Sequence, residues 1–394
     1  MQIEYINGDK NAGVKYDWKK IIKEYNKLGC PSTVYNPTKL PLPKAAYFQL
    51  LSERSTGKTT NILLFGMVMH KLYGTIIQYI RVSESMIMNK TIGELFKTIR
   101  EFHYVEKITD GEYNDVVYRA RKWHYCKVDD SGEVTAISPT HFMYCLSVDK
   151  NEMYKSSYNA PLGDWIIFDE FIGKIYRMNE FVYLMDLLKT IIRDRQSAKI
   201  IMLANTIDKH SEYFNEFEVY DDVQLLEVGN SEIFTTEKGT NIYIELIADK
   251  KENIKKKIIN ALYFGFRNPK INSITGGGWS TNNYPHIEKR FKKIIGGIFI
   301  DYHERLLAID IVHYDDKGYY LHVHKATRAY DDSVIYTLKE PKDKRYRYYM
   351  GMGDGLDRLI VRMVKNHRIM FQNNACGTMF FNHFNQKDAK KAGY

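Results

Sequence analysis

The central part of the chain, from residue 47 to about 205, alternates short apolar runs with longer amphipathic stretches. Five runs have the length and content of buried strands: 47–51, 75–82, 142–148, 165–168 and 199–203. Three stretches carry apolar residues at helical spacing: 61–72, 91–102 and 178–192. Strands that alternate with helices in this way predict an α/β fold with a mostly parallel, doubly wound sheet. The segment 110–134 is hairpin-like, with its turn at 129–132.

The pattern changes after about residue 220. A strand-like run at 241–246 precedes a basic helical run at 250–260. Further along, the runs 296–312 and 319–325 have the pattern of paired antiparallel strands. Because 394 residues are many for one hydrophobic core, we predict two domains joined by a linker. Their expected bounds are 1–225 for the first domain, 226–240 for the linker and 241–394 for the second domain.

Composition narrows the class of protein. With 44% hydrophobic residues and no apolar run long enough to span a bilayer, the sequence predicts a soluble globular protein without a membrane partner. The N-terminal residues lack a signal-peptide pattern, so we expect no export. The cysteines are scattered, which fits reduced cytoplasmic thiols and gives little support to disulfides or a zinc site: Cys30, Cys126, Cys145 and Cys376.

The net charge of +9 points to a polyanionic partner, with nucleic acid as the first candidate. Basic clusters gather in the C-terminal half: 255–257, 289–293, 345–347, and Arg358, Arg362 and Lys365 on one helical face. Lysine and arginine on a surface suffice for contacts to a nucleic-acid backbone without sequence preference. A solvated basic surface is the alternative that charge alone leaves open.

The first candidate site follows the strand at 47–51 and precedes the helix at 61–72. It reads Ser52-Glu53-Arg54-Ser55-Thr56-Gly57-Lys58-Thr59-Thr60. A strand, a loop ending in Gly-Lys-Thr and a helix form the arrangement that cradles the phosphates of ATP. Lys58 would bridge the β- and γ-phosphates, and the Thr59 hydroxyl would bind Mg²⁺. The usual first residue of this loop is Gly, and Ser52 stands there instead.

A second candidate site follows the strand at 165–168, where the chain reads Asp169-Glu170. We expect this strand to lie beside the strand of the phosphate loop. Asp169 would coordinate Mg²⁺, directly or through water, and Glu170 would polarise the attacking water. A water-activating carboxylate favours hydrolysis over phosphoryl transfer to a small molecule.

Two further residues are placed to take part in hydrolysis. Asn205 ends the strand at 199–203, where it would touch the γ-phosphate or the attacking water; a simple turn is the alternative. Arg193 ends the helix at 178–192, and in a ring it would reach the nucleotide of a neighbour as an arginine finger. The alternative for Arg193 is a favourable interaction with the helix C-terminus.

These segments resemble, in the same order, the DNA encapsidation ATPases of small tailed phages with protein-primed genomes. The similarity is dense over 35–220, and Phe168-Asp169-Glu170-Phe171-Ile172 followed by Arg193-Asp194-Arg195 is its most specific part. The other matching segments are 35–37, 52–59, 79–82, 155–156, 184–186 and 203–205. Beyond residue 240 the similarity is one of layout.

The resemblance implies a pentameric ring motor at the portal vertex of an empty capsid. It would drive double-stranded DNA inward in the cytoplasm of the infected host cell, docked on a structural RNA ring or the portal. It further implies that hydrolysis is carried by Lys58, Asp169, Glu170, Lys155 and Arg193. Arg54 would contact the nucleotide or transmit its state.

For the C-terminal part the resemblance implies an RNase H-like domain without nuclease activity. Asp301 and Asp310 lie on predicted strands where a nuclease keeps metal-binding carboxylates, so a packaging enzyme that also cuts DNA stays open. A nucleotide-gated scaffold that binds nucleic acid without productive turnover is the other alternative.

Overall fold

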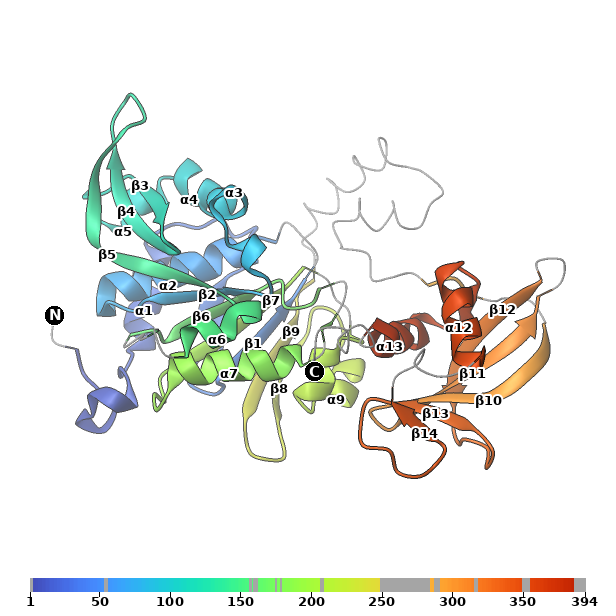
Figure 1. Ribbon diagram of the computed structural model, residues 1–394. Helices are drawn as coiled ribbons and strands as arrows, with labels where there is room; N and C mark the ends of the chain where they lie inside the picture. The colour runs from blue at the N-terminus through green and yellow to red at the C-terminus, as the bar shows by residue number, and fades with distance from the viewer. Residues whose placement is uncertain are drawn as a thin grey trace. The chain divides into compact units, whose positions relative to one another are not determined.

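The computed structural model describes most of the chain in two compact units (Figure 1). The first unit comprises 1–172, 179–207 and 221–279, and the second comprises 173–178, 208–220 and 280–394. Within these units the described residues are 3–52, 56–155, 158, 162–173, 176–177, 179–205, 209–248, 284–286, 291–314, 318–348 and 355–385. The basic run at 250–260 and the cluster at 255–257 lie outside them.

The first unit is built on a nine-stranded sheet with the order β3-β4-β5-β2-β6-β7-β1-β9-β8. The strands are β1 (Tyr47–Leu51), β2 (Ile77–Arg81), β3 (Asp115–Arg119), β4 (Lys122–Val128), β5 (Val134–Ser147), β6 (Trp165–Asp169), β7 (Lys199–Ala204), β8 (Ser231–Thr235) and β9 (Asn241–Leu246). From β5 to β9 in this order all neighbours are parallel. The carboxyl ends of β6, β7 and β1 therefore meet at one edge of the sheet.

Helices cover both faces of this sheet, with α1 (Trp18–Asn26) and α2 (Lys58–Tyr73) on one face and α7 (Glu180–Ile192) on the other (Figure 1). The shorter helices of this unit are α3 (Asn89–Ile92), α4 (Lys97–Glu101), α5 (Tyr104–Ile108), α6 (Asn151–Tyr154) and α9 (Tyr220–Leu225). Gly66 of α2 lies against the sheet: a Cβ there would come within 2.6 Å of the Trp165 side chain. This close approach packs the middle of α2 against the first residues of β6 and β2.

Most predicted elements of the first unit are present, with one break. The expected helix at 91–102 is divided into α3, a 3-10 turn (Gly93–Phe96) and α4, and the backbone leaves the helical conformation at Phe96 (φ −100°, ψ 9°). The predicted hairpin around 129–132 joins β4 to β5.

The predicted linker at 226–240 is wrong, and so is the domain start at 241. β9 pairs in parallel with β1, and β8 pairs antiparallel with β9, so residues 231–246 extend the first sheet. The change of pattern after residue 220 marks a hairpin at the sheet edge. Its outer strand, β8, is mostly exposed and therefore lacks the continuous apolar pattern of the central strands, whereas β9 is largely buried.

The second unit holds a six-stranded sheet with the order β14-β13-β10-β11-β12-β15. Its elements are α8 (Glu212–Glu216), β10 (Lys292–Tyr302), β11 (Arg305–His313), β12 (Tyr319–Ala326), β13 (Val334–Thr337), β14 (Tyr346–Tyr348), α12 (Gly355–Lys365), β15 (Ile369–Phe371) and α13 (Asn374–Asn385). β10, β11 and β12 are antiparallel, and β13 and β14 continue parallel to β10. Three antiparallel strands, extended beyond β10 by two strands parallel to it, form the RNase H-like sheet that the resemblance implied.

One face of this sheet is covered by α12 and α13, whose apolar residues pack on Ile300, Leu307 and Val323. Arg358, Arg362 and Lys365 are exposed on α12, as the spacing predicted. Among the described residues of both units, no helix has the length and apolar character needed to cross a membrane.

Candidate ATP site

The loop between β1 and α2 is held by residues that precede β1 and by a side chain of α2 itself. The backbone N–H of Tyr35 donates to the Thr56 carbonyl (2.8 Å), and the Asn61 side chain donates to the Gly57 carbonyl (2.9 Å). Gly57 has a φ of 73°, and a Cβ on it would lie 2.9 Å from Val34. Gly57 is therefore required both by its backbone conformation and by the space available. Glu53, Arg54 and Ser55 lie outside the described residues.

Lys58 is the first residue of α2, and its ammonium is buried. It donates to the Ser52 hydroxyl and, at 3.4 Å, to the side-chain oxygen of Asn205. Ser52 is fully buried and also pairs with the Thr56 hydroxyl (2.9 Å). The serine that replaces the usual Gly thus supplies a hydrogen-bond acceptor for the phosphate-loop lysine.

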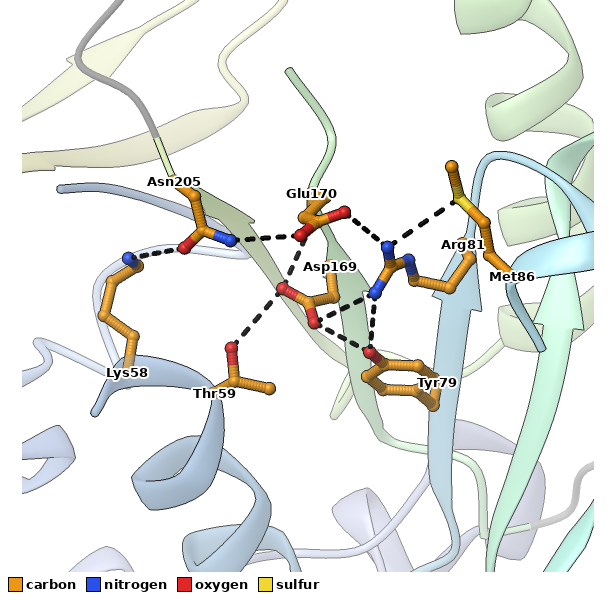
Figure 2. A network of polar contacts seen from close by, with 8 residues as sticks. All are labelled: Lys58, Thr59, Tyr79, Arg81, Met86, Asp169, Glu170 and Asn205. Carbon is orange, nitrogen blue, oxygen red and sulfur yellow. Dashed lines mark hydrogen bonds and ion pairs between the residues drawn. The ribbon is translucent and has the colours of Figure 1, made fainter. Parts of the chain in front are cut away.

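Asp169 ends β6 and faces the start of α2 (Figure 2). The Thr59 hydroxyl lies 3.4 Å from Asp169 Oδ1, and the Tyr79 hydroxyl donates to Asp169 Oδ2 at 2.7 Å. Burial, and then the charge of Asp169, raise the pKa of Tyr79 well above its usual value, so this hydroxyl stays protonated. Thr59 and Asp169 present the hydroxyl and carboxylate oxygens that Mg²⁺ prefers.

Glu170 follows directly and is held on both sides. Its carboxylate forms an ion pair with Arg81 and accepts a hydrogen bond from Asn205 Nδ2 at 3.2 Å (Figure 2). Its backbone has a φ of 55°, the left-handed region that non-glycine residues seldom adopt. Strain of this kind concentrates at functional sites, where surrounding contacts maintain it.

Asn205 connects the two halves of the site. It stands just after β7, accepts from Lys58 and donates to Glu170. The expectation that β6 lies beside β1 is wrong, because β7 pairs with both strands and separates them. The insertion of β7 is what brings Asn205 between the phosphate-loop lysine and the carboxylate.

Tyr79 and Arg81 join the site without having been predicted as site residues. Arg81 contacts the Tyr79 hydroxyl (3.2 Å), Asp169 (3.5 Å) and Glu170. Burial disfavours the charged guanidinium, but Tyr79, Asp169 and Glu170 outweigh burial and raise the pKa of Arg81. The signal in the sequence is the alternation Tyr79-Ile80-Arg81 at the end of a buried strand, which puts two polar side chains on one face.

A cavity of about 500 Å³ opens over the start of α2. Its walls include Gly57, Lys58, Thr59 and Thr60, the side chain of Asn205, and the aromatic pair Phe102 and Tyr104. A neighbouring cavity of about 400 Å³ shares Thr56 and Val34 with it. Positive charge and helix N-terminal N–H groups at the base of such a cavity suit phosphate groups.

Lys155 and Arg193 lie outside this network. The Lys155 ammonium contacts Glu152 (2.8 Å) and Asp186 (3.0 Å), and hydrogen bonds to these carboxylates raise its pKa. Arg193 follows α7 and donates to the Tyr158 carbonyl at 3.2 Å. Nearby Arg195 is paired with Asp164, which precedes β6, so this corner lies at the amino edge of the sheet. At about 3.3 Å per residue, the length of β6 separates that edge from Asp169 by about 16 Å.

Asp301 and Asp310 occupy the open face of the second sheet, away from α12 and α13. Asp301 pairs with Leu306, four positions before Asp310 on β11, so the two carboxylates stand about 13 Å apart along the strand. Asp301 contacts Lys342 (3.5 Å), while Asp310 contacts Lys293 (3.0 Å) and His324 (3.1 Å). In this arrangement the two aspartates do not share a metal ion.

No protein-family model and no curated protein matches the sequence. The fold, in contrast, is similar to solved structures of two packaging motors. The phi28 gp11 DNA packaging motor aligns with 89% of this chain and 97% of its own, at 15% identity and a TM-score of 0.50. The bacteriophage phi29 viral genome packaging motor assembly aligns with 90% and 99%, at 16% identity and a TM-score of 0.53. At these identities the similarity establishes the fold, and the α/β fold class predicted from the sequence is confirmed.

Proposed function

We propose that this chain is an ATP-hydrolysing motor that translocates double-stranded viral DNA into a preformed capsid. It would act as a homo-oligomeric ring, a pentamer, docked at the portal or on a structural RNA in the cytoplasm of the infected host cell. The fold shared with two packaging motors supports this assignment, and so does the chemistry of the ATP site. The observation that carries it is the network that joins Lys58, Asn205 and Glu170 at one edge of the sheet.

ATP binding is supported by the loop and its cavity. The triphosphate would displace Ser52 from Lys58 and accept hydrogen bonds from the N–H groups at the start of α2. Thr59 and Asp169 would hold Mg²⁺, since their oxygens already lie 3.4 Å apart. When bound, Mg²⁺ supplies positive charge to the β- and γ-phosphate oxygens as they develop negative charge.

Hydrolysis is supported by the position of Glu170. A general base must lie within hydrogen-bond reach of the attacking water. Asn205 bridges Lys58 and Glu170. Lys58 would contact the γ-phosphate, and Glu170 would accept the proton of the attacking water. Arg81 pairs with the Glu170 carboxylate, so Glu170 must loosen this contact to act as a base.

An arginine finger acting between neighbours is supported by the place of Arg193. Since Arg193 stands at the amino edge of the sheet, it is too far from Lys58 of its own chain to touch the same nucleotide. It would instead complete the site of the next subunit. Lys155, which is also outside the network, would belong to the same intersubunit surface.

The test is Mg²⁺-dependent release of phosphate from ATP by the assembled protein. Glu170→Gln, which keeps the shape of the side chain and removes the base, is expected to abolish steady-state turnover while ATP still binds. Glu133→Gln, on an exposed turn, is the matched control and should hydrolyse ATP as the unmodified chain does. Unimpaired turnover by Glu170→Gln would remove the proposed base.

The finger is tested by mixing two inactive variants. Arg193→Ala keeps a complete base and Glu170→Gln keeps a complete finger, so a mixed ring contains some interfaces with both groups intact. Activity should reappear on mixing. If both variants assemble and the mixture stays inactive, Arg193 does not act between subunits.

A further inference from the structure

A chain of buried polar side chains reaches the phosphate loop from α1. The Asn61 side chain, in the first turn of α2, donates from Nδ2 to the Gly57 carbonyl at 2.9 Å. Its oxygen, Oδ1, accepts a hydrogen bond from the Tyr25 hydroxyl at 2.6 Å. Tyr25 and Asn61 are each 3% exposed. Because Tyr25 belongs to α1, these two hydrogen bonds tie the loop to a second helix.

The peptide group between Gly57 and Lys58 is the point at which this chain ends. The Gly57 carbonyl accepts from the backbone N–H of Asn61 at 3.1 Å as well as from Nδ2, so two donors fix its direction. In a planar trans peptide the N–H group points opposite to the carbonyl. The Lys58 N–H therefore points out of the N-terminus of α2, where phosphate oxygens would accept from it.

The Tyr25 hydroxyl stabilises the orientation of the Asn61 amide that this arrangement needs. A backbone carbonyl only accepts hydrogen bonds, so the amide must turn its NH2 group to Gly57 and its oxygen to Tyr25. Without the hydroxyl, Oδ1 would be a buried acceptor that has lost its donor, which costs free energy. The amide would recover part of this cost by turning toward another donor, and its bond to the loop would weaken.

Tyr25 is itself held in place on two sides. Its ring packs on the ring of Phe65, one turn beyond Asn61 on α2, with 5.6 Å between the ring centroids. Its hydroxyl also contacts the thiol of Cys30, which in turn contacts the hydroxyl of Tyr104. Burial, and then the contact with Cys30, raise the pKa of Tyr25 far above its usual value, so the hydroxyl stays protonated and can donate to Asn61.

We propose that Tyr25 is a positioning residue for the phosphate loop. Through Asn61, its hydroxyl holds the peptide group between Gly57 and Lys58 in the orientation that receives the phosphates of ATP. The inference rests on the proposed ATP binding and adds a residue of α1 to it. Asp169 and Glu170 are not part of this chain of contacts, so Tyr25 contributes to nucleotide binding and not to the chemical step.

Tyr25→Phe tests this role because it keeps the ring on Phe65 and removes only the hydroxyl. The dissociation constant for a slowly hydrolysed ATP analogue with Mg²⁺ should rise by roughly 2- to 12-fold, the equivalent of the net contribution of one hydrogen bond. ADP should lose affinity by a similar factor, because the loop cradles phosphates that both nucleotides carry. KM for ATP should rise while kcat stays within about twofold, the pattern of a lost binding interaction.

Tyr16→Phe is the matched control. The Tyr16 hydroxyl also donates to a buried group, Asp164 at 2.9 Å, but this contact lies before the start of β6. Tyr16→Phe should lower the melting temperature and leave the affinity for both nucleotides unchanged. Thermal unfolding of each full-length variant establishes that it is folded at the temperature of the binding assay.

A double-mutant cycle tests the route through Asn61. Asn61→Ala removes the amide, so adding Tyr25→Phe to it should cause no further loss of affinity. Unchanged affinity of Tyr25→Phe, an equal loss in Tyr16→Phe, or additive losses in the double variant would overturn the inference while leaving ATP hydrolysis intact. If the unmodified chain binds neither the analogue nor ADP, the proposed function itself fails, and the inference fails with it.

Discussion

The Ser52 hydroxyl is expected to compete with ATP for Lys58. The buried Lys58 ammonium donates to this hydroxyl, and the two residues are 3% and 0% exposed. A triphosphate must take Lys58 from Ser52 before the lysine can bridge phosphates. Ser52→Ala removes the competing hydroxyl and leaves the size of the side chain almost unchanged.

The loss of stability expected for Ser52→Ala follows from the burial of the contact between Lys58 and Ser52. A hydrogen bond from a charged donor contributes about 1.5–3 kcal/mol to the free energy of unfolding. Because Lys58 keeps its contact with Asn205 at 3.4 Å, the lower part of that range, about 1.5–2 kcal/mol, applies to Ser52→Ala. For a domain of this size the melting temperature without nucleotide should fall by about 3–8 °C.

ATP affinity should change in the opposite direction. The unmodified chain gives up the contact between Lys58 and Ser52 when it binds ATP, and the variant has no such contact to lose. The dissociation constant should therefore fall by about tenfold, the equivalent of about 1.4 kcal/mol. A slowly hydrolysed analogue titrated by calorimetry in Mg²⁺ measures this change, and thermal unfolding measures the loss of stability.

Two further variants make the result decisive. Ser52→Gly also lacks the hydroxyl and should shift ATP affinity in the same direction. Ser32→Ala, an exposed serine in the wall of the neighbouring cavity, should change neither quantity. Weaker ATP binding by Ser52→Ala, together with an unchanged melting temperature, would refute the reasoning, because the hydroxyl would then serve the nucleotide.

Three other perturbations test separate contacts. Arg81→Met leaves Asp169 and Glu170 without their cation. Because these side chains are partly exposed, the free energy of unfolding, measured by urea titration, should fall by only about 1–3 kcal/mol. An unchanged midpoint would show that the ion pairs do not contribute to stability. Gly66→Ala pushes a methyl group into Trp165 and Ile77 and should cost about 1–3 kcal/mol by the same measurement, whereas a gain would mean that the helix shifts freely. Burial lowers the pKa of His383 to about 3, so as pH falls below about 6.5 the histidine of the unfolded chain is protonated first. The free energy of unfolding should therefore decrease from pH 6.5 toward pH 3, and His383→Leu should make this pH dependence weaker. An equal pH dependence in both proteins would show that other groups cause it.

The residues of the candidate ATP site were predictable from the sequence because strongly apolar strands precede them. Asp169, Glu170 and Asn205 stand where a buried strand stops, and Lys58 opens a helix after a glycine that the turn requires. That these residues lie close together in space was less predictable. The order of strands in a sheet depends on pairing between distant segments, and no local pattern shows that β7 lies between β6 and β1.

The same limit explains the two unpredicted features of the fold. The strands β8 and β9 join the first sheet because β9 pairs with β1, beginning at Tyr47 and Ile242. These two strands are far apart in the sequence. The segment 208–220 lies within the first domain in the sequence but packs in the second unit. Arg81 was overlooked for a related reason, since its role depends on the neighbouring strand that carries Glu170.

The most direct test of the proposed motor function is ATP-driven uptake of double-stranded DNA by empty phage capsids. The purified protein, capsids, double-stranded genomic DNA and Mg²⁺-ATP are combined, and DNA that resists added nuclease is measured. We expect protected, genome-length DNA with the unmodified chain and none with Glu170→Gln, although the variant still binds ATP and assembles. Equal protection of DNA by Glu170→Gln, or protection without ATP, would contradict a motor driven by hydrolysis at this site.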